Sequence, residues 1–144
     1  MSKTSNAAEL VRTRTAGEIC YVSLTSPDNL NALGADMAVA LRETCLPIFE
    51  DTEVALDNIL DPLHAFLEGM AASDKITVFS VHGAVAGAGL SLVSMGDFCI
   101  AEEGTNFVPA YASIGLTPDG GGSVGLIRSV GARNAMRLLL AEDR

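Results

Sequence analysis

The sequence lacks long apolar runs, and it has few basic residues, few aromatic side chains and only two histidines. Its hydrophobic stretches are interrupted by Gly, Ser, Asp or His before they reach the roughly 20 residues that a transmembrane helix needs. Residues 1–10 are polar and contain no apolar segment typical of a secretory signal. These absences exclude a transmembrane helix, and we expect a cytoplasmic protein with no membrane partner.

The charge balance is strongly acidic. Nine Lys and Arg residues stand against eighteen Asp and Glu residues, which gives a formal net charge of -9. Nucleic acid is repelled by such a surface unless it carries a local basic patch, and Arg12 with Arg14 is too small a patch. We therefore expect no nucleic-acid partner.

Cysteine and histidine are too scarce and too scattered for a metal centre. Cys20, Cys45 and Cys99 are odd in number and far apart, so we expect reduced thiols that behave as small buried hydrophobes. His64 and His82 have no close Cys or carboxylate partner, which argues against a zinc site. His64 is expected to be structural or exposed, beside the buried stripe of a helix.

The chain does contain enough apolar residues, 49% of 144, to build one compact domain and to exclude intrinsic disorder. Strand, glycine-rich loop and helix units follow one another in its second half, which predicts a mixed α/β architecture with crossover connections. Proline is expected to divide the helices, because Pro47 should stop one and Asp61-Pro62 should begin another. The predicted strands are residues 19–25, 75–81, 98–101 and 106–108, and the predicted helices are residues 35–46, 54–72, 90–95 and 132–141.

Eleven of the fourteen glycines fall at or after Gly83, and their motifs exclude two nucleotide-binding classes. A dinucleotide-binding motif, Gly-x-Gly-x-x-Gly, would begin at Gly87-Ala88-Gly89, but Leu92 stands in place of its third glycine. A phosphate-binding P-loop ends in Gly-Lys-Ser/Thr, and no lysine follows Lys75.

A hydrolase motif, Gly-x-Ser-x-Gly, occurs at residues 121–125, but its context is wrong. No strand precedes it and no histidine follows His82, so the match is interpreted as accidental. Ser123 is instead predicted to cap the helix that follows.

Two glycine-rich segments remain open to a structural or a functional reading. Residues 83–90 join a strand to a helix, where small residues allow either close packing or approach of a ligand to the helix N-terminus. Free amides there can stabilise a developing oxyanion. Asp119, within residues 115–123, is either a solvent-facing turn residue or a carboxylate at the mouth of a pocket.

From about Ile19 to its end, the chain resembles the enoyl-CoA hydratase/isomerase family, also called the crotonase superfamily. Three blocks carry the resemblance, each with its own set of residues. They are residues 27–33 with Met37 and Leu41; residues 76–89 with Asp97 and Ala101; and residues 107–121 with Leu126, Gly131 and residues 135–140. The resemblance implies a crotonase-like α/β fold, a spiral of ββα units that is incomplete here, with residues 1–18 as a polar lead-in and residues 19–144 as the core.

The resemblance also implies a chemistry. Members bind acyl-CoA thioesters and stabilise an enolate oxyanion with two backbone amides, of which Ala88 would supply the second. Hydratase-type members use two glutamates, and Ser91 and Tyr111 stand at those positions, which argues against hydration. Some members that isomerise double bonds use an aspartate at the position of Asp119, so Asp119 is the expected acid/base. The implied substrate-binding residues are Asn29, Asn31, Val85, Gly87, Tyr111 and Pro118.

Two departures from the family bear on activity. No loop of the type A-G-x-D-L, which supplies the first oxyanion amide, is found between Pro47 and the helix at Asp57, and the sequence ends where the family continues. The leading hypothesis is therefore an enoyl-CoA isomerase-like enzyme, and the alternative is a non-catalytic acyl-CoA-binding or assembly subunit. No metal or separate cofactor is expected, because coenzyme A is part of the substrate. A full fold would form trimers or dimers of trimers.

Overall fold

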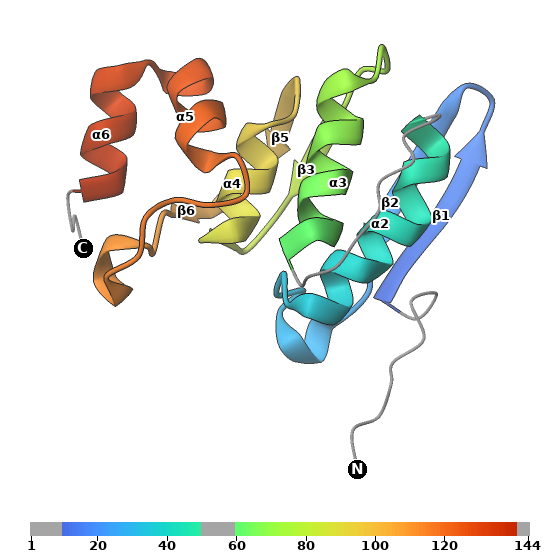
Figure 1. Ribbon diagram of the computed structural model, residues 1–144, viewed down its shortest axis with the longest axis horizontal. Coiled ribbons are helices and arrows are strands. Elements are labelled where there is room, and N and C mark those ends of the chain that lie inside the picture. The colour runs from blue at the N-terminus through green and yellow to red at the C-terminus, as the bar shows by residue number, and fades with distance from the viewer. Residues whose placement is uncertain (1–9, 50–59, 141–144) are drawn as a thin grey trace. The chain divides into compact units, whose positions relative to one another are not determined.

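The computed structural model describes residues 10–49 and 60–140. The chain divides into two compact units, Met1–Ser73 and Asp74–Arg144, and each is described by itself. Figure 1 shows both and labels most of their helices and strands. None of the helices among the described residues is long and apolar enough to cross a membrane.

The first unit is a β-hairpin followed by two helices. Strand β1 (Val11–Ala16) pairs antiparallel with β2 (Ile19–Leu24), and Gly17, at φ 61°, turns the chain between them. A short 3-10 helix, η1 (Pro27–Asn29), leads to helix α2 (Ala35–Phe49). Helix α2 packs against β1 and lies beside α3 (Leu60–Ala72) (Figure 1).

Strand β1 was not predicted from the sequence, and its burial shows why. Only Val11 is buried, and the other five side chains are exposed. A strand that contributes one side chain to a core carries no alternation of apolar and polar residues, so its pattern is that of a polar loop.

The core of the first unit lies between the two helices. The predicted apolar stripe of α3 is confirmed, because Leu63, Phe66, Leu67 and Met70 are all buried, whereas His64 is exposed as expected. The α3 stripe packs with the buried residues of α2, which are Met37, Ala38, Ala40, Leu41 and Cys45.

The cysteines do not share one environment. Cys45 is 2% exposed, and burial raises the pKa of its thiol to about 12, which keeps it in the inert thiol form. The expectation of buried cysteines is wrong for Cys99, which is exposed on strand β5 (Phe98–Ala101).

Pro47 does not stop α2 as predicted. The helix continues to Phe49, and proline occupies its last turn. A proline there has no N–H to donate to the Glu43 carbonyl, so the helix loses one backbone hydrogen bond about one turn before its end. Packing holds this last turn, because the ring of Phe49 lies 5.7 Å from the ring of Phe66 on α3.

Helix α3 already includes Leu60 and Asp61, so Asp61 is not its N-cap as predicted. Pro62 still lies in the first described turn, where its missing N–H is tolerated. The predicted helix over residues 54–59, and the segment in which the A-G-x-D-L loop was sought, fall largely on residues 50–59 and so lie outside the described residues.

The second unit contains two small parallel sheets joined through a helix. Strand β3 (Val78–Val81) pairs with β5, and β4 (Ala84–Ala86) pairs with β6 (Asn106–Val108). Helix α4 (Ala88–Ser94) connects the first strand pair in sequence, β3 and β4, to the second, β5 and β6. This is the strand–strand–helix order of the predicted ββα spiral. Helices α5 (Gly122–Val130) and α6 (Ala132–Leu140) follow a second 3-10 helix, η2 (Ala112–Ile114).

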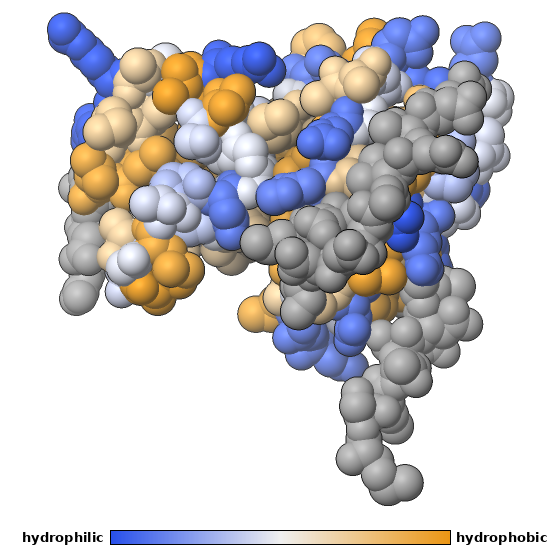
Figure 2. Space-filling model, viewed as in Figure 1, coloured by the Kyte–Doolittle hydropathy of each residue, from blue (hydrophilic) through white to orange (hydrophobic). Residues whose placement is uncertain are grey.

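Helices α4, α5 and α6 pack in succession, and a small core lies beneath them. It consists of Val85, Leu90, Leu126 and Ala135, with Val81, Val93 and Leu139 packed against it. Other apolar side chains remain at the surface of this unit. Figure 2 shows such residues over α6, where Met136 is 54% and Leu140 66% exposed.

Strand β3 is shorter than the predicted residues 75–81 because Asp97 takes the hydrogen bonds of Thr77. The Asp97 carboxylate accepts the Thr77 backbone N–H at 2.8 Å and the Thr77 hydroxyl at 2.9 Å. These bonds favour the charged form and lower the pKa of Asp97. The pair fixes the start of β3 beside the start of β5.

Candidate active site

Three polar side chains from separate elements of the second unit meet in one hydrogen-bonded chain. The Tyr111 hydroxyl, from the turn before η2, donates to Oδ1 of Asp119 at 2.6 Å, a length typical of an O–H bond to a carboxylate. The same hydroxyl lies 2.8 Å from Oγ of Ser91 on α4. Ser91 and Tyr111 are buried, at 0% and 5% exposure, while Asp119 is exposed. The structure thus places Ser91 and Tyr111 beside Asp119, the predicted acid/base.

The Tyr111 phenol is held in its neutral form. Burial and the hydrogen bond to Asp119 raise its pKa to about 12, and the Ser91 hydrogen bond opposes them only in part. At neutral pH Tyr111 is therefore a hydrogen-bond donor to Asp119.

This raised pKa predicts a loss of stability at alkaline pH. Between pH 10, the ordinary value, and pH 12 the unfolded chain loses the phenol proton while the folded chain retains it, so deprotonation favours unfolding. Urea unfolding should show the free energy of unfolding falling through this window, and falling less steeply in Tyr111→Phe. Tyr21→Phe, which changes the only other tyrosine, is the control. Equal slopes in wild type and Tyr111→Phe would contradict the prediction.

Glycines bring α5 close to α4 at this cluster. A Cβ on Gly122 would overlap the Ser91 hydroxyl, and a Cβ on Gly121 would meet Sδ of Met95 at 2.8 Å. Gly121, at φ 81°, is the N-cap of α5, so the prediction that Ser123 caps this helix is wrong. Ser123 lies inside α5 with its side chain exposed.

The predicted oxyanion amide lies at the start of α4. Gly87, the N-cap, donates its own N–H to the Val108 carbonyl at 3.0 Å, which ties the helix start to β6. Ala88 is the first helical residue, so no carbonyl within α4 can accept its N–H. No acceptor for this N–H is found among the residues that the structure describes.

The remaining second-unit residues differ in their surroundings. Val85 is 7% exposed and belongs to the hydrophobic core beneath α4. Pro118 is half-buried, and its Cβ lies 3.5 Å from the position of a Cβ built on Gly122. Pro118 therefore borders the Ser91–Tyr111–Asp119 chain, whereas Val85 supports the helix that carries Ser91.

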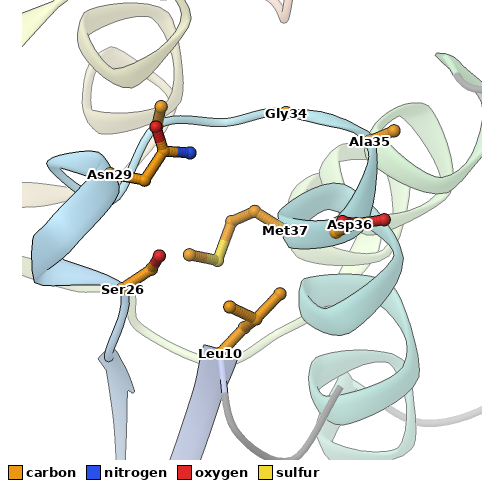
Figure 3. Close-up of a pocket in the computed structure, with 8 residues that line it drawn as sticks. Leu10, Ser26, Asn29, Gly34, Ala35, Asp36 and Met37 are labelled. Carbon is orange, nitrogen blue, oxygen red and sulfur yellow. The ribbon is translucent and has the colours of Figure 1, made fainter. Parts of the chain in front are cut away.

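Asn29 and Asn31 belong to the first unit. Asn29 lines a cavity of about 320 Å³ at the N-terminal end of α2, into which the Met37 side chain extends toward Ser26 and Leu10 (Figure 3). The side-chain oxygen Oδ1 of Asn31 accepts the Ser26 N–H at 2.7 Å. Asn31, at φ 51°, thus closes the loop beside this cavity.

Chemically, the cluster offers one carboxylate with one oxygen held by a buried phenol. Such a group can accept a proton and return it. Adding water across a double bond needs two groups, a base that takes a proton from the water and an acid that gives a proton to the carbon. The hydrogen bonds among Ser91, Tyr111 and Asp119 were not foreseen. Their sequence separations of 20 and 8 residues leave no periodic signal, and only the resemblance placed the three residues in one site.

Comparison with known proteins decides the family. The family model described as enoyl-CoA hydratase/isomerase matches residues 22–144. The chain belongs to this family. Among its relatives, a trans-2-decenoyl-[acyl-carrier-protein] isomerase of Streptococcus mutans is 42% identical over 79% of this chain and 44% of its own length. A 1,2-epoxyphenylacetyl-CoA isomerase of Escherichia coli is 36% identical over 62% of this chain and 33% of its own length.

A solved structure confirms the predicted family fold. The chain matches an enoyl-CoA hydratase from a Polaromonas species with a TM-score of 0.75 and 28% identity, over 90% of this chain and 62% of that one. The crotonase-like α/β fold, incomplete here, is therefore confirmed. The chain spans between 28% and 61% of the length of the relatives that it matches, and about half in several of them.

Proposed function

We propose that this protein shifts the double bond of an enoyl thioester, with Asp119 as the single acid/base and the Ala88 amide as an oxyanion donor. The observation that carries the proposal is the 2.6 Å hydrogen bond by which Tyr111 holds the Asp119 carboxylate. By the family resemblance, Ser91 and Tyr111 take the positions of the two hydratase glutamates. Their hydroxyl groups are hydrogen-bonded in series to the carboxylate of Asp119.

The proposed reaction needs one base only. Asp119 removes a proton from C4 of a 2-enoyl thioester, a C3=C4 bond forms, and the electron pair of C2=C3 moves to C1=C2 as negative charge grows on the thioester oxygen. The N–H of Ala88 donates to that oxygen, and one such donor contributes about 3–4 kcal/mol. Asp119 then returns the proton to C2, the carbonyl re-forms, and a 3-enoyl thioester results. No water is added and no cofactor is consumed.

The test is to incubate the 144-residue chain with 2-decenoyl-CoA and to separate the products by chromatography with mass detection. We expect a 3-enoyl isomer of unchanged mass, and no product heavier by one water. A hydrate as the main product would contradict the proposal. Binding of the thioester without either product would favour the alternative, a non-catalytic acyl-CoA-binding subunit.

A further inference from the structure

The direction of the hydrogen bonds around Tyr111 follows from counting protons. A tyrosine hydroxyl carries one proton, and here it goes to Oδ1 of Asp119 at 2.6 Å. At the 2.8 Å contact with Ser91 the phenol oxygen must therefore be the acceptor, and Ser91 the donor. The chain runs one way, from Ser91 through Tyr111 to Asp119. Donors in such a chain polarise and strengthen one another.

The two oxygens of Asp119 differ in their surroundings. Oδ1 is bound by Tyr111, whereas no hydrogen bond to Oδ2 is found among the described residues. The donors are buried and the carboxylate is exposed, so Tyr111 approaches from the protein side and leaves Oδ2 unheld. One oxygen is an anchor, and the other is available for chemistry.

Hydrogen bonds and close packing also fix the turn that carries Asp119 and the position of Ser91. The Gly122 N–H donates to the Asp119 carbonyl at 2.9 Å, which closes the turn that carries the carboxylate. Gly122 also leaves the space that the Ser91 hydroxyl occupies. The Ser94 hydroxyl donates to the Ser91 carbonyl at 2.7 Å. Gly122 therefore both holds the Asp119 backbone and leaves room for Ser91, the first donor in the series of hydrogen bonds.

From this arrangement we infer that Ser91 and Tyr111 are positioning residues that fix the Asp119 carboxylate, so that the proton is taken and returned by Oδ2 alone. The inference rests on the proposed function. It adds that the proton which leaves C4 stays on Oδ2 until Oδ2 delivers it to C2, because the Tyr111 hydrogen bond to Oδ1 keeps the carboxyl group from rotating away from the substrate. Fixed geometry of this kind raises kcat, because a misplacement of about 1 Å costs up to about a hundredfold in rate.

The test compares Tyr111→Phe and Ser91→Ala with wild type and with Tyr21→Phe, which removes an exposed phenol of the first unit. In deuterium oxide, a proton kept on Asp119 yields isomer without deuterium. For Tyr111→Phe we expect kcat to fall about tenfold to a hundredfold at an unchanged KM, and the deuterium-free share of product to fall. Ser91→Ala should shift both quantities in the same direction by less, and Tyr21→Phe should change neither.

A wild-type share of deuterium-free product in Tyr111→Phe would overturn the inference, even if that variant were less stable. A second measurement needs no substrate. In the Tyr21→Phe background Tyr111 is the only tyrosine, and its ultraviolet titration should move to lower pH when Asp119→Asn removes the neighbouring charge. An unmoved titration would also overturn the inference. If the titration moves but wild type forms no isomer, the contact stands and the proposed function fails instead.

Discussion

Asp119→Asn is expected to lower the rate of isomerisation by about a hundredfold to ten-thousandfold, the range that a positioned general acid/base contributes. An amide cannot accept the C4 proton, because its oxygen is a far weaker base than a carboxylate. It can still accept the Tyr111 hydrogen bond that now reaches Oδ1 at 2.6 Å. The substitution therefore removes the base while it preserves volume and anchor, and thioester affinity should stay within about twofold of wild type.

The matched control for Asp119→Asn is Glu103→Gln, which removes an exposed carboxylate between β5 and β6 of the same unit. Both variants lose one negative charge, so a general effect of charge on binding would appear in both. Initial rates over a range of thioester concentrations separate kcat from KM, and calorimetry with a non-reactive acyl-CoA measures affinity. Full activity in Asp119→Asn would show that another group moves the proton.

The sequence predicted the buried stripe of α3 from its helical period. Strands β5 and β6 also lie at the predicted residues, although all their side chains are exposed and carry no alternation. Prediction failed where tertiary contacts override local preference. Pro47 stays helical because Phe49 packs on Phe66, and β3 begins late because Asp97 binds Thr77.

The site was predicted only in part, for a physical reason. Resemblance placed Asp119, Ala88, Ser91 and Tyr111 in one region, and glycine content indicated a close approach of backbone there. Which atoms meet depends on how α5 docks on α4, and that docking is set by single Cβ atoms that are missing at Gly122 and Gly125. A turn residue and a carboxylate of a site have the same sequence signature, and Asp119 is an exposed turn residue whose carboxylate also accepts the Tyr111 hydrogen bond.

Gly125→Ala is expected to destabilise the second unit by about 1–3 kcal/mol, the usual cost of an extra methyl group in a filled space. Its Cβ would lie 2.7 Å from the carbonyl carbon and oxygen of Ser94, and backbone atoms cannot turn aside as a side chain can. Helix α5 would have to move away from α4, which carries Ser91, so the hydrogen bonds to Tyr111 should weaken as well.

The control for Gly125→Ala is Gly89→Ala on α4, where a Cβ meets nothing within 4 Å and the backbone needs no positive φ. Alanine in a helix is favoured over glycine by roughly 0.5–1 kcal/mol, so this variant should be as stable as wild type or more stable. Urea unfolding of the two variants measures the difference. Both changes add the same methyl group, so the two variants differ mainly in the space that faces each glycine. Equal stabilities would mean that α5 does not pack against the Ser94 backbone at Gly125.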